Sequence, residues 1–123
     1  MPYADSDFFV SLFKGEDWLK KRAFVILDKY KTSIWTSKWT VIEILLIGER
    51  YEFDPNVIVE SIFKISDVKD ADKNFFIAIA HLMKENGMTV FDALHALSCD
   101  DDYIISSDKI FDKIGMNRIK LEE

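Results

Sequence analysis

The stretch MTVFDALHAL, residues 88–97, holds a carboxylate inside an otherwise apolar segment of helix-favouring residues. Thr89 has the side chain of a helix N-cap, and the helix predicted after it places Phe91 and Leu94 on one side. Asp92 follows Phe91 directly, so we expect its carboxylate to lie on or at the edge of the same inward face. Burying an unpaired carboxylate is costly in free energy. The sequence therefore predicts that Asp92 has a partner: a cationic side chain, a set of backbone donors or a metal ion.

The composition is typical of a globular protein. The chain has 123 residues, of which 49% are apolar and 31% charged, so it can bury a core and is not expected to be disordered. Its apolar runs are too short to span a bilayer, and the acidic start MPYADSDFF does not resemble a signal peptide. A single cysteine, Cys99, excludes an internal disulfide and agrees with a reducing compartment. We therefore expect one domain over residues 1–123 and a cytoplasmic location.

The net charge limits how the chain can bind nucleic acid. A formal charge of -6 at pH 7 argues against a protein that coats nucleic acid by bulk electrostatics. Divalent cations held by carboxylates reverse the local sign of the charge. The net charge therefore does not exclude a nuclease that contacts nucleic acid at one cation-filled site.

Strand candidates alternate with helices along the whole chain. An extended piece at residues 1–6 opens the chain, and short strands are predicted at residues 33–36, 65–68, 103–106 and 118–121. Helices are predicted at residues 8–13, 16–31, 37–50, 56–64, 73–86, 90–97 and 109–114, with Asp54-Pro55 and Asp72 as start signals. This alternation predicts an α/β fold with a short, largely parallel central sheet flanked by helices.

A second acid interrupts an apolar face in the helix predicted at residues 37–50. Trp39, Ile42 and Leu46 share one side of that helix at spacings of three and four residues, and Glu43 lies on the same side. We therefore expect Glu43 to point inward, as we expect of Asp92.

Two further acids stand at the ends of predicted strands. Asp5 ends the first extended piece, and Asp108 lies where a strand gives way to a helix. In parallel sheets ligands bind beyond the carboxyl ends of the strands, an edge that Asp92 and Glu43 can also reach. Four clustered carboxylates repel one another unless cations lie between them, and Mg²⁺ or Mn²⁺ suits such oxygen ligands. Hydrolysis of a phosphodiester is the chemistry that most often requires this arrangement.

The same residues give the chain a family resemblance. In order and length, the sequence resembles the PIN-domain proteins of the small VapC type, which are the toxin ribonucleases of toxin-antitoxin pairs. The matching pieces are Asp5-Ser6, the T-x-x-E of residues 40–43 followed by Ile44-Leu45, the segment FDALHA at residues 91–96, and the turn ISSD at residues 105–108 followed by Phe111.

The resemblance implies a three-layer PIN-like sandwich and a metal-dependent endoribonuclease. Its metal site would hold one or two Mg²⁺ or Mn²⁺ ions, with the four carboxylates Asp5, Glu43, Asp92 and Asp108 as catalytic ligands. It also implies an RNA substrate, an antitoxin protein that blocks the site, and a homodimer.

Three more residues are candidates for supporting roles, of which Ser106 is given by analogy with the family. Ser106 takes the place of the hydroxyl residue that supports the acid two positions later. Asp7 stands where an amide or small polar residue is common, so it either adds a ligand or caps a helix. His95, three residues after Asp92, either touches substrate or is satisfied within its helix.

Plainer interpretations stay open beside this one. Asp before a helix is a common N-cap, which alone accounts for Asp5 and Asp108. A receiver-like signalling module also holds Mg²⁺, beside a phosphoacceptor, and Asp5 with Asp7 fits that pattern. A PIN-like protein that binds partners without nuclease activity is the third alternative.

Overall fold

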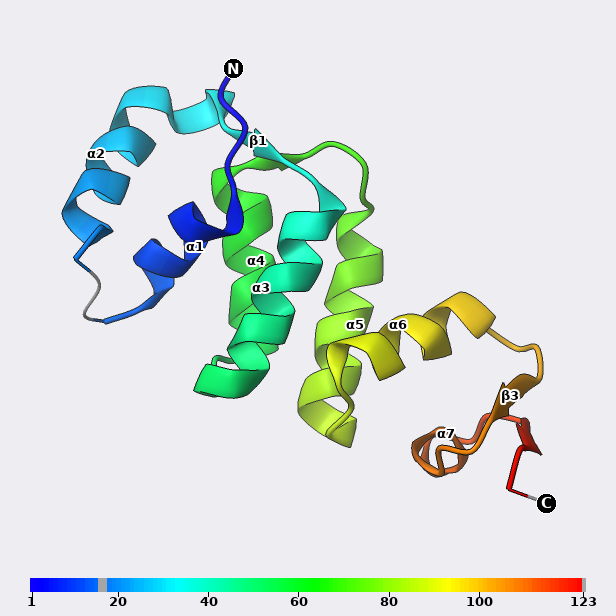
Figure 1. The fold of residues 1–123 in the computed structure, drawn as a ribbon. Helices are drawn as coiled ribbons and strands as arrows, with labels where there is room; N and C mark the ends of the chain where they lie inside the picture. The colour runs from blue at the N-terminus through cyan, green and yellow to red at the C-terminus, as the bar shows by residue number, and fades with distance from the viewer. Residues whose placement is uncertain (16–17, 123) are drawn as a thin grey trace.

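Helices make up most of the structure, and the strands between them are two or three residues long (Figure 1). The computed structural model describes residues 1–15 and 18–122. The elements in chain order are α1 (Ser6–Phe13), α2 (Lys20–Tyr30), the 3-10 turn η1 (Lys31–Ser33), β1 (Trp35–Thr36), α3 (Lys38–Tyr51), α4 (Pro55–Ile65), β2 (Asp67–Val68), α5 (Lys73–Asn86), α6 (Val90–Cys99), β3 (Ile104–Ser106), α7 (Ile110–Lys113) and β4 (Arg118–Lys120). The predicted alternation is confirmed over this range; Glu16 and Asp17, the predicted start of the second helix, lie outside the described residues. No helix in the described ranges is long and apolar enough to cross a membrane.

The core lies where α3, α4 and α5 pack side by side (Figure 1). Ile44 and Leu45 of α3, Val59 and Ile62 of α4, and Ile79 of α5 are all 0% exposed. Within each helix the buried residues recur at helical spacing, so each helix turns one apolar side toward its neighbours. Each such side chain contributes roughly 1.5–3 kcal/mol by leaving water.

Gly48 allows α3 and α4 to approach closely. A Cβ atom at this position would lie 2.6 Å from Cδ1 of Ile58 and 3.5 Å from the Cβ of Phe53. Carbon atoms normally stay about 3.5–4.0 Å apart. Since Ile58 is itself only 2% exposed, it has little room to move away. The missing side chain of Gly48 therefore leaves the space that the end of the Ile58 side chain fills between the two helices.

Three helices begin at the residues that the sequence predicted. The carboxylate of Asp54 accepts a hydrogen bond from the N–H of Asn56, with Pro55 in the first turn of α4. Asp72 caps α5 in the same way. At α6 the Thr89 hydroxyl accepts from the backbone of the third helical residue. These caps satisfy backbone donors that a helix start leaves without partners.

The strands form two small parallel sheets at opposite ends of the molecule (Figure 1). β1 pairs with β2, and Tyr3 makes a parallel bridge to Trp35 on the other side of β1. β3 pairs with β4, with Ile105 opposite Ile119. Parallel pairing is as predicted, whereas the expected central sheet is divided in two. The division arises because α6 packs on α5 and leads the chain away from β1 before β3 begins (Figure 1).

The prediction that Glu43 points inward is wrong. Trp39, Ile42, Glu43 and Leu46 do share a side of α3, but Trp39 is 67% exposed, Leu46 is 45% exposed and Glu43 is also exposed. The opposite side, which includes Ile44, is the one buried against α4. Both sides of α3 carry apolar residues, so periodicity alone did not identify the inner one.

The same ambiguity affected α6. Its buried residues are Val90, Ala93 and Ala96, whereas Phe91 is 50% exposed. Asp92 is half-buried, at the border between the two sides. The prediction that Phe91 marks an inward face is therefore wrong, and Asp92 lies beside the buried side of the helix without being buried itself.

Replacing Ile62 by alanine tests the helical core. Ile62→Ala removes a side chain with no exposure from α4 and should lower the free energy of unfolding by about 2–5 kcal/mol, through lost burial and a residual cavity. Urea unfolding followed by circular dichroism measures the change. Val57→Ala is the control, because Val57 lies on the same helix and is 58% exposed, and it should change the stability little. Equal losses in the two variants would contradict this account of the core.

Candidate functional site

A hollow of about 250 Å³ lies between α6 and the C-terminal unit formed by β3, α7 and β4. Asp92 and His95 of α6 line one side, and Ser106 and Asp108 line the other. Ile104, Ile105 and Phe111 complete the wall. The hollow therefore joins two carboxylates with a hydroxyl and an imidazole from segments that are separate in the sequence.

Two side chains fix the start of α6 and so the position of Asp92. The Thr89 hydroxyl accepts a hydrogen bond from the N–H of Asp92 at 3.2 Å. Glu49, which comes from α3, accepts from the N–H of Val90 at 2.5 Å. Asp92 thus lies in the first turn of a doubly capped helix, where the positive end of the helix dipole favours a carboxylate. His95 follows one turn later, on the same side of α6.

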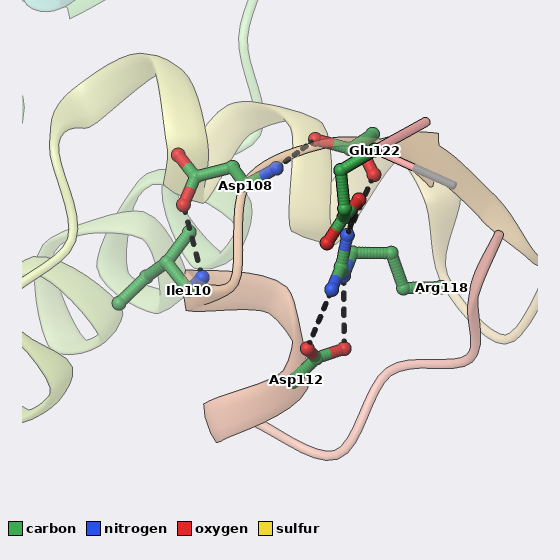
Figure 2. A network of polar contacts seen from close by, with 6 residues as sticks. Asp108, Ile110, Asp112, Arg118 and Glu122 are labelled. Carbon is green, nitrogen blue, oxygen red and sulfur yellow. Dashed lines mark hydrogen bonds and ion pairs between the residues drawn. The ribbon is translucent and has the colours of Figure 1, made fainter. Parts of the chain in front are cut away.

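Asp108 is held by two hydrogen bonds, one from its backbone N–H and one to its carboxylate. Its N–H donates to the Ser106 hydroxyl at 3.0 Å, and its carboxylate Oδ1 accepts from the N–H of Ile110 at 3.0 Å (Figure 2). Ser106 thus contacts the backbone of the acid two positions later. The bond from Ile110 fixes the Asp108 carboxylate at the start of the short helix α7.

Arg118 of β4 ties the C-terminal unit together (Figure 2). Its side chain is only 1% exposed and donates to both carboxylate oxygens of Asp112, at 3.0 and 2.9 Å. It also donates to Glu122 at 2.9 Å and to the backbone carbonyl of Ser106 at 2.8 Å. Paired bonds from one guanidinium to a carboxylate are strong and fix geometry. Arg118 therefore supports the strand that carries Ser106 toward the hollow.

These bonds shift the ionisation of all three charged groups. Hydrogen bonds from Arg118 lower the pKa of Asp112 and of Glu122. In return, the hydrogen bond to Asp112 raises the pKa of Arg118 above its ordinary value. Sequence reasoning missed this network, because the strand candidate RIKL at residues 118–121 alternates cationic and apolar residues and so does not mark Arg118 as buried.

The other predicted ligands lie elsewhere. Asp5 caps α1 by accepting from the N–H and the hydroxyl of Ser6, at 2.5 and 3.1 Å, and it lines a separate hollow of about 190 Å³. Asp7 lies exposed in the first turn of α1, and Glu43 lies exposed on α3. The structure thus brings together Asp92 and Asp108, but not these three acids.

The two carboxylates of the hollow fit a weakly held hard cation. Within residues 1–15 and 18–122, no group of three or more His, Cys, Asp or Glu side chains could hold a metal ion. Mg²⁺, however, often binds through only one or two carboxylates and keeps several waters or phosphate oxygens. Both carboxylate oxygens of Asp92 and Oδ2 of Asp108 accept no hydrogen bond from the described part of the chain, so they are available as ligands.

An apolar groove of about 520 Å³ runs beside the hollow, between α3, α5 and α6. Trp39, Ile42, Phe75, Phe91 and Leu94 line it, with Lys38, Asp70 and Asp72 at its polar border. Trp39 and Phe91 are both at least half exposed, which is unusual for side chains of this size. The exposed sides of α3 and α6 therefore meet in one surface suited to a partner.

A scan against protein-family models matches no family, and searches of curated proteins and of solved structures find no match either.

Replacing Arg118 by methionine tests the C-terminal unit. At pH 7 Arg118→Met should speed the hydrogen exchange of backbone amides in residues 104–120, because the variant lacks the bonds to Asp112 and Glu122. The folded-state pKa values of these two acids lie below their unfolded values, so their contribution is present at neutral pH and is lost as the pH falls below about 4. The difference between variant and wild type should therefore shrink at pH 3.

Lys113→Met is the matched control, since it removes an exposed cation from the same unit. It should leave exchange unchanged at both pH values. A difference for Arg118→Met that is as large at pH 3 as at pH 7 would mean that the bond to the Ser106 carbonyl or the packing of the arginine stem, and not the ion pairs, holds the unit together.

Proposed function

We propose that this chain is a Mg²⁺- or Mn²⁺-dependent endoribonuclease that hydrolyses RNA phosphodiester bonds. The observation that supports the proposal is the hollow that Asp92 of α6 and Asp108 of the C-terminal unit both line, with Ser106 beside Asp108. Two carboxylates in one hollow repel an RNA phosphate, and a bound divalent cation removes that repulsion. Both carboxylate oxygens of Asp92 and Oδ2 of Asp108 are left without a hydrogen bond from the described residues, so they can serve as cation ligands.

Each residue of the hollow has a role in this proposal. Asp92 and Asp108 would hold the cation, which activates a water and stabilises the leaving oxygen. Ser106 orients Asp108 through its backbone N–H. His95 lies close enough to the hollow to donate a hydrogen bond to a phosphate oxygen when it is protonated.

The finer family features are part of the same proposal. We propose the three-layer PIN-like sandwich as the active architecture, with Asp92 and Asp108 as its cation ligands. Asp5, Asp7 and Glu43 of the same copy lie outside the hollow.

We also propose that the enzyme is the toxin of a toxin-antitoxin pair. The groove lined by Trp39 and Phe91 lies next to the hollow, since both are bordered by α6. An antitoxin that buries apolar side chains in this groove would reach the catalytic carboxylates with its adjacent residues. Exposed aromatic side chains are the residues most often central to such interfaces.

Cleavage of RNA by the purified protein tests the proposal. Wild-type protein should cleave RNA with Mg²⁺ or Mn²⁺ and not with EDTA, and Asp92→Asn or Asp108→Asn should reduce the rate by about 100-fold or more through loss of a cation ligand. Asp101→Asn, which changes an exposed acid in the turn after α6, is the control and should keep full activity. Unfolding curves establish that all three variants fold.

Cleavage that survives both Asp92→Asn and Asp108→Asn would overturn the proposal. Absence of cleavage, together with a stable acyl phosphate after incubation with a small phosphodonor, would instead favour the receiver-like alternative.

The role of Ser106 gives a second, finer test. Ser106→Ala removes the acceptor of the Asp108 N–H and should lower the cleavage rate by about 10-fold, a typical cost for a residue that orients a metal ligand. Higher Mg²⁺ concentration should restore part of the loss. Ser107→Ala changes the exposed neighbouring hydroxyl and should have no effect. Equal rates for the two variants would remove Ser106 from the site.

A further inference from the structure

The N-terminal strand segment has an open edge. The N–H of Ala4 donates to the carbonyl of Trp35 at 2.8 Å, and the N–H of Trp35 donates to the carbonyl of Pro2 at 3.1 Å. Successive residues of a strand direct their polar groups to opposite sides, so the N–H and C=O of Tyr3 point away from β1. Neither group has a backbone partner in the described residues.

The C-terminal sheet has a matching open edge. The N–H of Ile104 donates to the carbonyl of Asn117 at 2.9 Å, and the carbonyl of Ser106 accepts from Leu121 at 3.3 Å. The N–H and C=O of Ile105 therefore point away from β4. The Ile105 side chain is 65% exposed, so this edge is apolar as well as unpaired.

Both edges are unusual for parallel strands. Parallel sheets are normally covered on both faces, and an isolated pair of strands is marginally stable in water. Natural proteins usually protect an open edge with charges, proline or a bulge, but here Ile105 and Tyr103 stand at the edge of β3 and are both well over half exposed. An edge of this kind is a template for another strand.

The two edges of one chain cannot readily pair with each other. They lie at opposite ends of the molecule, with α3 and α5 between them (Figure 1). Buried Val90, Ala93 and Ala96 fix α6 in the core, and only residues 100–103 connect α6 to β3. Four extended residues span at most about 14 Å. A second copy of the chain, in contrast, offers both missing edges at once.

We propose that β3 of one copy pairs in parallel with residues 2–4 of a second copy, and that the exchange is reciprocal. All observed strand pairs run parallel, so β3 can extend the N-terminal sheet without reversing its direction. A two-fold symmetric dimer makes this contact twice. Each edge of β3 and each edge of residues 2–4 is then paired, so no further copy can add to the assembly at these edges.

This pairing would complete the candidate site, an inference that rests on the proposed nuclease function. Parallel strands end at the same edge of a sheet. Asp5 directly follows residues 2–4, and Asp108 follows Ser106, the last residue of β3, by two positions. Asp5 of one copy would therefore join Asp92 and Asp108 of the other, and each active site would be built from two copies.

The molecular mass in solution tests the pairing itself. Wild type should be a dimer by light scattering, and Ile105→Pro should be a monomer, because proline removes the outward N–H while every β3–β4 bond stays. Ile105→Thr keeps the N–H and a β-branched side chain, and it should remain dimeric. A monomeric wild type, or a dimeric Ile105→Pro, would overturn the proposal.

Complementation tests whether the site is shared. Asp5→Asn and Asp92→Asn should each be inactive alone. The two variants are then co-expressed under different tags and purified together. Half of the dimers should be mixed, and each mixed dimer has one intact site of two. The mixture should therefore recover about a quarter of the wild-type rate. Active wild type with no recovery would overturn the shared site. The two proposals can fail separately. If wild type is dimeric and Ile105→Pro is monomeric but the protein never cleaves RNA, the strand pairing stands and only the nuclease function is refuted.

Discussion

The close approach of α3 and α4 at Gly48 is the constraint on which the rest of the structure depends. With no Cβ at this position, Ile58 and Phe53 reach the backbone of α3, and the apolar sides of both helices meet over their length. α5 then packs on α4, and α6 packs on α5. The strands are too short to organise a core of their own, so the helices place them.

That order of packing also determines the position of the carboxylates. Thr89 and Glu49 fix the first turn of α6, and Asp92 is carried on it. Within the C-terminal unit, the guanidinium of Arg118 joins Asp112, Glu122 and the backbone of Ser106. Phe111 anchors this unit in the same hydrophobic core as α6. The hollow that Asp92 and Asp108 line is therefore placed by the core and by the Arg118 network together.

The acids illustrate how one residue type performs two physical tasks. Asp5 and Asp108 each accept backbone hydrogen bonds at a helix start, as an Asp in that position usually does. The same geometry leaves carboxylate oxygens near the carboxyl end of a strand, where cations and phosphates bind in open α/β sheets. An Asp that accepts a backbone hydrogen bond with one oxygen can therefore offer its second oxygen to a cation, which is the role that we propose for Asp108.

The sequence by itself determined the helix starts at Asp54, Asp72 and Thr89, the alternation of helices with strands, and the parallel pairing, because caps and periodicity depend on neighbours in the chain. It also determined that Trp39, Ile42, Glu43 and Leu46 share a side of α3. Only the tertiary structure decided that this side faces outward, that the strands divide into two sheets, and that Asp92 meets Asp108 while Asp5 and Glu43 lie elsewhere. The physical reason is that α3 has apolar residues on both sides, and the side that is buried depends on the closest available partner, which Gly48 makes α4.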